Sequence, residues 1–423
     1  MAPIVDALDL LIWMPGQRQP VVAGQVVDKT NVVSFRYEAG YLEQPDAISL
    51  FDLDLPLGDG QQLPQDPHRI SPSLRDALPD RWGRRVIAAG LRADGIWCGA
   101  EDEIDDITLM LRTGLDRIGA LGFCRPGTVL SNTETASPPL EELVRLVDII
   151  DDGEPVPSEL RPLLPHCASV GGARPKALFS DAQGRRFIAK FGMADDYPVV
   201  QGEFVAMRLA EHAGISVAPA RIEQVDGRPV LLVRRFDRQP HPAGGEMRHH
   251  MVSALTWMQV GEMSARHITY PQLAAIMEAS FADPVRDKAE MFARILFNIL
   301  VGNTDDHARN HAAFWDGEAL RLTPAYDISP QRRSTRTANL AMALADGSRA
   351  ATLANAAAVA PAFGISDAAF RQIVDRLVGT ITSHWSAVCH EAGLSRSERE
   401  RLSGCQFLNE YAFEGMGRTP RLQ

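Results

Sequence analysis

The sequence pattern changes near residue 250, and this change constrains the fold more than any single motif does. Before that point, short runs rich in β-branched and aromatic residues recur between turn residues, as in β-strands. After it, Ala-rich segments of helical character continue to the end, with few strand signals. A β-rich part followed by a helical part predicts an α+β fold, because each part must bury its own apolar faces.

The length of 423 residues suggests two or three domains, at about 150 residues each. The clearest boundary is the Pro- and Ser-rich stretch 131–165, which holds one amphipathic helix. We therefore predict four regions: a β-rich N-terminal subdomain (1–130) with a hairpin around Pro15-Gly16, a linker (131–165), a small α+β lobe (166–245) and a helical lobe (246–423).

Charge and cysteine usage narrow the class of protein. With a formal net charge of −11, the chain is a poor direct binder of nucleic acid and favours a basic protein partner. Its five cysteines stand far apart without a CxxC pair, which suits a reducing cytoplasm. No apolar run reaches the about 20 residues of a membrane helix, and the first residues lack the basic segment of a secretory signal. We expect a cytoplasmic protein that does not cross a membrane.

The stretch 298–315 places many ionisable and amide groups directly after an apolar run that ends in Gly302. Four residues separate Asp305 from Asn310. This is the spacing of a kinase catalytic loop, in which the Asp orients the substrate hydroxyl and the Asn holds magnesium. The His and Arg that precede the Asp in protein kinases are absent here.

Three more residues fit phosphoryl transfer. Lys190 lies in a β run with apolar neighbours, where a lysine is costly unless it meets an anion. Glu203, thirteen residues later, opens a predicted helix that ends at Gly214. A strand Lys and a helix Glu hold the ATP phosphates in protein kinases. Asp327, seventeen residues after Asn310 and behind a short β-like connection, stands where a kinase places another magnesium ligand.

Two adjacent glycines, Gly171 and Gly172, precede Lys176 and the β run that it begins. Such a pair lets the backbone approach a phosphate closely. The segment matches neither of the usual nucleotide-binding patterns, so by itself it indicates only a turn.

Other interpretations of 305–311 stay open from the residues alone. On a helix, His307 and His311 would share one face, as in a metal hydrolase, with a neighbouring aspartate as an oxygen ligand. However, an alanine follows His307, so the general base of the HExxH motif is missing. His307 can instead line a nucleotide site, and Asp306 can cap a helix N-terminus.

With these motifs in view, the chain resembles the HipA family, the serine/threonine-kinase toxins of bacterial type II toxin–antitoxin modules. The resemblance spans nearly the whole chain. The segments that carry it are LIWMPGQRQPVVAG (11–24), LPDRWGRR (78–85), GLDRIGALGF (114–123), SVGGARPKALF (169–179), FIAKFG (187–192), LLVRRFDR (231–238), GNTDDHARN (302–310) and LTPAYDIS (322–329).

The resemblance implies a protein-kinase-like two-lobed fold, with a small β-rich N-lobe, a helical C-lobe and an extra N-terminal β-rich subdomain. It also implies that the chain uses ATP and Mg²⁺. By motif match, Asp305 looks like the catalytic base, Asn310 and Asp327 like the metal ligands, and Lys190 like the phosphate-binding lysine. The other residues implied to contact the cofactor lie in the glycine loop, the first helix, the hinge beside the adenine and the catalytic region: Gly171, Gly172, Ala173, Arg174, Pro175, Lys176, Glu203, Arg234, Arg235, Phe236, His307 and Tyr326.

Regulation and partners also follow from the resemblance. Ser169 matches the loop serine that family members autophosphorylate, and a phosphate there would add about two negative charges and eject the loop. The family's usual partner is a HipB-like helix-turn-helix antitoxin, so DNA would be met only through the antitoxin. Known substrates include aminoacyl-tRNA synthetases.

We therefore predict an ATP-dependent serine/threonine kinase toxin that arrests growth by phosphorylating a protein, with an aminoacyl-tRNA synthetase as the implied class of target. The competing hypothesis is a catalytically idle co-repressor that binds the antitoxin. The intact set of Lys190, Asp305, Asn310 and Asp327 speaks against it, because an inactive kinase usually lacks at least one of these groups.

Overall fold

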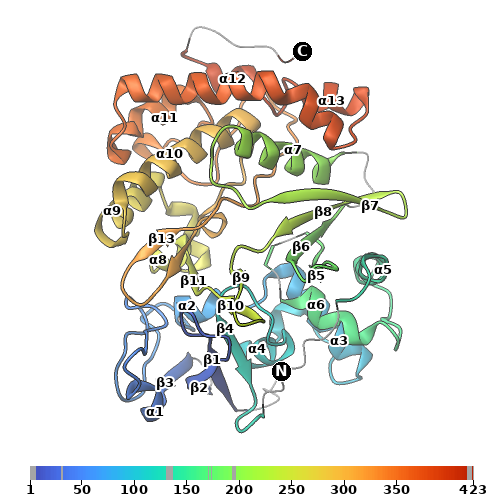
Figure 1. The fold of residues 1–423 in the computed structure, drawn as a ribbon, viewed down its shortest axis with the longest axis vertical. Helices are drawn as coiled ribbons and strands as arrows, with labels where there is room; N and C mark the ends of the chain where they lie inside the picture. The colour runs from blue at the N-terminus through green and yellow to red at the C-terminus, as the bar shows by residue number, and fades with distance from the viewer. Residues whose placement is uncertain are drawn as a thin grey trace. The chain divides into compact units, whose positions relative to one another are not determined.

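The computed structural model describes residues 6–29, 32–129, 137–169, 171–172, 174–192, 197–416 and 422. The chain divides into two compact units, and each is assembled from separate stretches of sequence. Figure 1 draws the ribbon with its helices and strands labelled. Unit 1 contains Met1–Phe191, Glu223–Val252 and Phe314–Glu318, and unit 2 contains Gly192–Ile222, Ser253–Ala313 and Ala319–Gln423. The two units are described separately below.

The N-terminal sheet of unit 1 has four antiparallel strands in the order β3-β2-β1-β4. They are β1 (Ala7–Ile12), β2 (Val21–Lys29), β3 (Val32–Tyr37) and β4 (Leu121–Cys124). Ile12 pairs with Val21 across the predicted turn, in which Gly16 has φ of 76°, so the hairpin is confirmed. Leu8 and Leu10, two positions apart, enter the same core because alternate side chains share one face of a strand.

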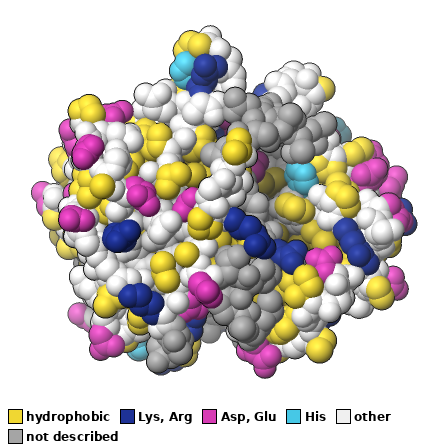
Figure 2. Space-filling model, turned by 90° about the horizontal axis from the view of Figure 1, so that it is seen from below, with side chains coloured by type: hydrophobic (Ala, Val, Ile, Leu, Met, Phe, Trp, Pro, Cys, Tyr) yellow, Lys and Arg dark blue, Asp and Glu magenta, His cyan; other side chains and the backbone are white. Residues whose placement is uncertain are grey.

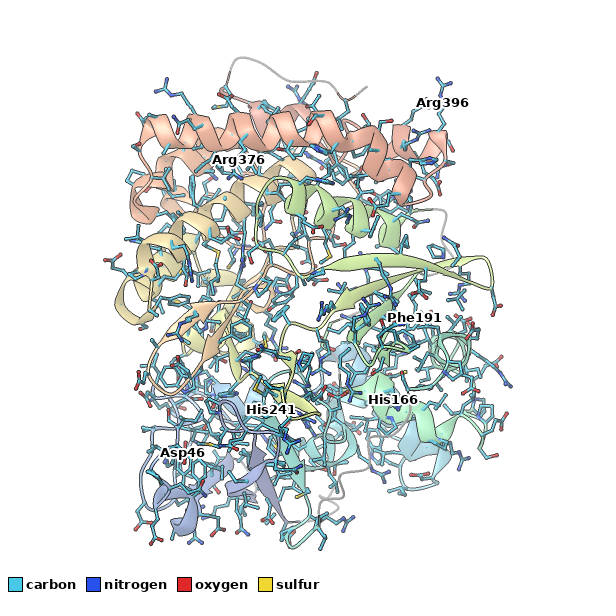
Figure 3. All side chains as sticks on the ribbon, viewed as in Figure 1. Asp46, His166, Phe191, His241, Arg376 and Arg396 are labelled. Carbon is cyan, nitrogen blue, oxygen red and sulfur yellow. The ribbon has the colours of Figure 1, made fainter. Side chains whose placement is uncertain are left out.

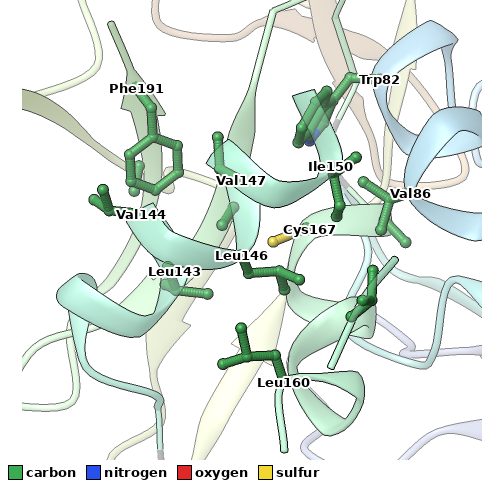
Figure 4. Packing of buried hydrophobic residues seen from close by; sticks show 14 of the residues in the cluster. Trp82, Val86, Leu143, Val144, Leu146, Val147, Ile150, Leu160, Cys167 and Phe191 are labelled. Carbon is green, nitrogen blue, oxygen red and sulfur yellow. The ribbon is translucent and has the colours of Figure 1, made fainter. Parts of the chain in front are cut away.

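A second core of unit 1 forms around three helices, α3 (Arg81–Ala93), α5 (Leu140–Asp151) and α6 (Leu164–Ala168). Helix α5 is the amphipathic helix expected between 131 and 165. Its side chains Leu143, Leu146, Val147 and Ile150 recur at helical spacing and pack around Cys167 (Figure 4). Unit 1 also contains the shorter helices α1 (Ala39–Leu42), α2 (Pro72–Arg75) and α4 (Asp106–Arg112).

A second four-stranded sheet has the order β5-β6-β8-β7. Its strands are β5 (Lys176–Ser180), β6 (Arg186–Phe191), β7 (Ala220–Val225) and β8 (Arg228–Arg234). The β runs predicted in the small lobe are therefore confirmed as β5, β6 and β8.

Five shorter strands follow in the sequence. The strands β9 (Arg238–Pro240) and β10 (Glu246–Arg248) pair with each other, and β11 (Met251–Ser253), β12 (Ala312–Trp315) and β13 (Leu320–Leu322) form a three-stranded sheet. Strands β12 and β13 are the β-like connection expected before Asp327. Strand β11 was not predicted, because three residues are too few to show a periodic pattern.

Unit 2 is mainly helical, as expected for the last part of the chain. Its helices are α7 (Val199–His212), α8 (Ala254–Trp257), α9 (Tyr270–Ser280), α10 (Pro284–Val301), α11 (Leu353–Val359), α12 (Asp367–Glu391) and α13 (Arg396–Leu402). One expectation was wrong: α7 begins at Val199, so Glu203 is buried within the helix and does not open it. Arg376 of α12, labelled in Figure 3, donates a hydrogen bond to the carbonyl of Ala213 at the end of α7.

Within the described residues, no helix is long and apolar enough to cross a membrane. On the face drawn in Figure 2, acidic and basic side chains are interspersed among apolar ones. Isolated apolar side chains on a surface are normal, so this mixture marks no binding site by itself.

Candidate active site

Helix α10 ends at Gly302, directly before the candidate catalytic loop. The side chain of Asp283 caps the helix start by accepting the N–H of Arg286, and the helix ends at Gly302 in the left-handed conformation, with φ of 72°. A Cβ on Gly302 would lie 2.9 Å from the carbonyl oxygen of Gln406. The predicted end of a buried apolar helix is confirmed, and both the backbone angle and the close approach require glycine here.

Asp305 and Asn310 stand at the two ends of a compact loop in unit 2. Asp305 is exposed, whereas Asn310 is buried and ends a short 3₁₀ turn (Ala308–Asn310). The Nδ2 of Asn310 donates to the carbonyl oxygen of Asp305 at 3.2 Å. Its Oδ1 makes no hydrogen bond with any described residue and can serve as a ligand. The loop therefore presents one carboxylate to solvent and one amide oxygen beside it.

Asp327 is tied to this loop through its neighbours. Its φ of 57° is unusual for a residue other than glycine, and such strain persists only where surrounding contacts enforce it. The amide Nδ2 of Asn303 approaches the carbonyl oxygen of Asp327 at 3.5 Å, and the hydroxyl of Tyr326 donates to the carbonyl of Arg309 at 2.8 Å. Unit 2 thus brings together the stretches that carry Asp305, Asn310 and Asp327.

Asp306 belongs to a buried network behind the loop. Its carboxylate accepts the hydroxyl of Tyr270 at 2.5 Å and lies 3.0 Å from Nε2 of His311. Burial alone would raise the pKa of Asp306, but His311 and Tyr270 hold this pKa below its ordinary value. The same burial, together with the Asp306 charge, raises the pKa of Tyr270 well above its usual range. A small pocket at this network is lined by Asn298, Asp306, Asn310, His311 and Tyr326, among others.

Two of the alternative interpretations of this stretch fail on geometry. Asp306 does not cap a helix, because its side chain points into the network with Tyr270. No helix runs from His307 to His311, since the 3₁₀ turn ends at Asn310 and β12 follows, so the shared helical face of a metal hydrolase does not exist. In the described ranges no group of three His, Cys, Asp or Glu side chains could hold a metal ion.

In unit 1, two lysines face each other across neighbouring strands. Lys176 of β5 is directly opposite Lys190 of β6 in the antiparallel register. Like charges in such positions repel each other, so the pair favours an anion nearby. Lys176 is buried, and its Nζ donates to the carbonyl oxygen of Gly171. Lys190 is half-buried.

The glycine loop is packed closely against Lys176. Gly172 has φ of 124°, a backbone angle that strains any residue with a side chain, and a Cβ there would lie 1.6 Å from the Nζ of Lys176, which would have to move. The start of α3 supports the loop, because Trp82 donates from its backbone N–H to the carbonyl of Gly172 and from its indole to that of Lys176. Arg174 and Pro175 complete the stretch before β5, and Ala173 lies outside the described residues.

Ser169 follows α6 directly and is half-buried. Its hydroxyl donates to the carbonyl oxygen of Pro165 at 3.3 Å, one turn earlier. This is the local bond of a residue at a helix end, and it leaves the role of Ser169 as a phosphorylation site a prediction.

The predicted hinge, Arg234 to Phe236, lies at the end of β8. Arg234 is exposed, and Phe236 packs edge-on against Phe314 with ring centroids 5.9 Å apart. The side chain of Arg235 is buried in unit 1, where it forms ion pairs with Asp116 at 2.7 Å and Asp237 at 2.8 Å. The Arg235 side chain therefore serves as an anchor, and the predicted adenine contact would have to come from the backbone.

The anchor around Arg235 is a buried ionic network that sequence reasoning missed. Arg238 also binds Asp116 at 3.0 Å and Asp237 at 2.8 Å. Burial would raise the pKa of Asp237, but Arg235 and Arg238 lower it to about 2. Burial acts in the same direction on Asp116, yet the surrounding arginines hold its pKa far below the ordinary value. The only sequence signal was the presence of six charged residues in the two segments GLDRIG and RRFDR, with no sign that these segments meet.

Two further predicted cofactor residues lie in unit 2. Glu203 is buried in α7, and because Lys190 belongs to unit 1, their ion pair stays a prediction. His307 is half-buried, and its Nδ1 has no hydrogen-bond partner in the part of the chain that the structure describes. A buried nitrogen of this kind is compatible with a ligand contact, and the contact with nucleotide remains a prediction.

Comparison with known proteins identifies the family of this chain. The HipA-like C-terminal domain matches residues 168–385, and the HipA N-terminal domain matches residues 10–124. The serine/threonine-protein kinase toxin HipA of Shewanella oneidensis is 28% identical over 306 residues, which cover 66% of this chain and 67% of that protein. The putative kinase Y4mE of Sinorhizobium fredii is 25% identical over 344 residues, covering 75% and 76% of the two chains.

A solved structure agrees with the fold. It is the Shewanella oneidensis HipA in complex with HipB and operator DNA, with a TM-score of 0.72, 23% identity, and coverage of 93% of this chain and 94% of that one. The mixed α+β architecture with an N-terminal β-sheet subdomain, expected from the sequence, is confirmed. The chain belongs to the HipA family. Within that family it is a HipA-like kinase.

Proposed function

We propose that this chain is the kinase toxin of a HipBA-like toxin–antitoxin module and transfers the γ-phosphoryl group of ATP to a hydroxyl of a protein. The observation that carries the proposal is the arrangement in unit 2, where exposed Asp305 adjoins buried Asn310 and both are tied to the segment of Asp327. In this proposal Asp305 orients the substrate hydroxyl and accepts its proton, which is the role of the loop aspartate in kinases.

The residues present fit Mg²⁺. Asn310 offers an amide oxygen and Asp327 a carboxylate, and a hard cation of this kind prefers oxygen ligands. Magnesium in kinase sites is usually held by one or two protein groups together with substrate phosphates, so a larger acidic cluster is not needed. Bound there, the ion would neutralise charge on the phosphates.

In unit 1 the proposed role is to hold the phosphates. Lys190 and Lys176 place two positive charges opposite each other on one face of the sheet. The glycine loop has no Cβ at Gly171 and Gly172, which lets backbone N–H groups approach a phosphate. Lys190 would act as the phosphate-binding lysine, and Lys176 would hold the glycine loop in place through Gly171.

Regulation, partner and target are also part of the proposal. Phosphorylation of Ser169 would place about two negative charges beside the glycine loop and disable it. The relative from Shewanella oneidensis is solved with HipB and operator DNA, and the net charge of −11 on this chain suits a basic antitoxin that binds the DNA itself. The target would be a protein, with an aminoacyl-tRNA synthetase as the class that the family resemblance implies.

The test compares Asp305→Gln with unmodified chain and with Glu400→Gln, an exposed carboxylate on α13. Transfer of label from [γ-³²P]ATP and growth arrest on expression should both be lost in Asp305→Gln and retained in Glu400→Gln. Growth arrest by a stable Asp305→Gln chain would contradict the kinase account of toxicity. Stabilisation of the unmodified chain by Mg·ATP in a thermal-shift experiment is also expected, whereas an idle co-repressor would show little or none.

A further inference from the structure

Residues 332–340 of unit 2 form a loop, here called the basic loop, whose two ends are hydrogen-bonded to the catalytic loop. The backbone N–H of Gln331, just before it, donates to the carbonyl oxygen of Gly302 at 2.9 Å. The N–H of Ala341, just after it, donates to the carbonyl oxygen of Thr304, also at 2.9 Å. Both stems of the basic loop are therefore fixed within three residues of Asp305.

The charge of this loop opposes that of the whole chain. From Ile328 to Ala345 the sequence contains no Asp or Glu, but it contains Arg332, Arg333 and Arg336. The chain as a whole has 54 acidic residues in 423 and a net charge of −11. The net charge of this segment is therefore positive, opposite in sign to that of the whole chain. A positive region on an acidic protein attracts anionic groups selectively to that place.

Among the described residues, no carboxylate pairs with the arginines of the basic loop. Arg332 lies over the ring of Tyr197 at 5.8 Å, and Arg333 lies over the ring of Tyr411 at 5.9 Å. Arg333 also donates to the carbonyl oxygen of Arg336 at 2.6 Å, which holds the loop in shape. Arg332 and Arg336 are exposed, and within the described ranges none of the three arginines forms an ion pair. Arg309 in the catalytic loop, by contrast, is paired with Glu262.

We propose that the basic loop docks an acidic segment of the protein substrate, with carboxylates near the target hydroxyl bound by Arg332 and Arg336. The inference rests on the proposed kinase function, because it places the docking site beside Asp305. Guanidinium groups bind carboxylates with two parallel hydrogen bonds, which gives orientation as well as attraction. The loop would thus select hydroxyls that have acidic neighbours.

An acidic peptide fits this surface better than a nucleic acid does. A protein that grips a duplex commonly neutralises about six to ten phosphates, whereas the basic loop offers three arginines on a chain of net charge −11. The exposed carboxylate of Asp305, next to the loop stems, would repel a continuous phosphate backbone. A short peptide can instead place its acids on the arginines and its hydroxyl near Asp305.

The test measures binding without ATP, so it does not depend on phosphoryl transfer. A fluorescein-labelled serine peptide flanked by Asp and Glu is titrated with full-length protein, beside the matched peptide with Asn and Gln and a random-sequence DNA duplex. The variants are Arg332→Gln with Arg336→Gln, and Arg332→Lys with Arg336→Lys. Arg396→Gln is the control, because Arg396 is an exposed arginine that projects from α13 in the same unit (Figure 3).

We expect the acidic peptide to bind about tenfold more tightly than the amide peptide, and more weakly as salt is raised. The double Gln variant should lose this preference, the double Lys variant should keep most of it, and Arg396→Gln should bind as the unmodified chain does. The proposal is overturned if the two peptides bind alike, if neither binds, or if the double Gln variant keeps the preference. It is also overturned if the DNA duplex is the only probe whose binding requires Arg332 and Arg336. A failure of the Asp305→Gln test would leave these binding results intact, so the two proposals fail separately.

Discussion

Each unit holds a buried polar network close in sequence to candidate site residues of that unit, and the two networks are built differently. In unit 1, Arg235 and Arg238 share Asp116 and Asp237, so the network consists of full charges. In unit 2, one carboxylate, Asp306, accepts hydrogen bonds from Tyr270 and His311.

The difference shows two ways of fixing a functional segment. The ionic network holds residues 235–238 directly after β8, and its stability depends on the balance of buried charges, since removing one partner leaves another uncompensated. The network of Asp306 and His311 joins the residue after Asp305 to the residue after Asn310. It therefore holds the two ends of the candidate catalytic loop together through partners gathered on one carboxylate.

The largest effect should follow removal of a charge from unit 1. Asp237→Asn leaves Arg235 and Arg238 buried with only Asp116 as a shared carboxylate, and should lower the free energy of unfolding by about 3–5 kcal/mol. Urea unfolding measures the loss. Glu400→Gln removes the exposed partner of Arg396 and should leave the free energy of unfolding almost unchanged, because solvent screens this pair. Equal losses in the two variants would show that burial of the charges does not set their importance.

A smaller loss is expected in unit 2. Asp306→Asn keeps the shape of the side chain but replaces a charged acceptor with a neutral amide, and should lower the free energy of unfolding by about 2 kcal/mol. Tyr270→Phe removes one donor and leaves His311 in place, so its loss should be no larger than that. Urea unfolding again provides the values, and a loss for Asp306→Asn that exceeds that of Asp237→Asn would reverse the comparison.

Acid should weaken both networks. The pKa of Asp306 is depressed in the folded protein, so its contribution to stability is complete above the ordinary carboxyl value of 3.8 and is lost as pH falls below it. The pKa of Asp237 is lowered from 3.8 to about 2, so its contribution is also complete above 3.8 and is lost as pH falls through about 2. The difference in unfolding free energy between unmodified chain and Asp306→Asn, and the same difference for Asp237→Asn, should therefore both shrink as pH falls below 3.8. Urea unfolding at about pH 7 and about pH 3 measures both differences, and a difference that grows in acid would contradict a depressed pKa.

The smallest effect is expected at the edge of the ionic network. Glu246 is partly exposed and lies 3.1 Å from Arg186 and 3.5 Å from Arg238. Because solvent screens this side chain, Glu246→Gln should lower the free energy of unfolding by less than about 1 kcal/mol. If Glu246→Gln lost as much unfolding free energy as Asp237→Asn, exposed members of the network would contribute as much to stability as buried ones.

The sequence predicted the features that depend on local patterns. The Pro15-Gly16 hairpin, the three strands of the small lobe and the helix that ends at Gly302 all follow from periodicity and turn residues. The kinase-like order of Lys190, Asp305, Asn310 and Asp327 could also be recognised, because the order and spacing of these residues are given directly by the sequence.

Partners that lie far apart in the sequence could not be predicted in the same way. Tyr270 is 36 positions from Asp306, and Asp116 is 119 positions from Arg235. Nothing in either segment specifies its partner, because a buried charge requires compensation without indicating where in the sequence it comes from. For the same reason the sequence left a helix cap open for Asp306, which is the local alternative for an aspartate after a turn.

Unit 1 is completed by residues that come late in the chain. The indole of Trp315 donates to the carbonyl of Ser49, and its ring meets Phe51 at 5.4 Å, so Phe314–Glu318 packs on residues that follow the third strand of the chain. Synthesis proceeds at roughly 5–20 residues per second. A nascent chain therefore spends many seconds on the ribosome with its first domain lacking this final segment. A chain organised in this way cannot complete its N-terminal unit until residues 314–318 have been synthesised.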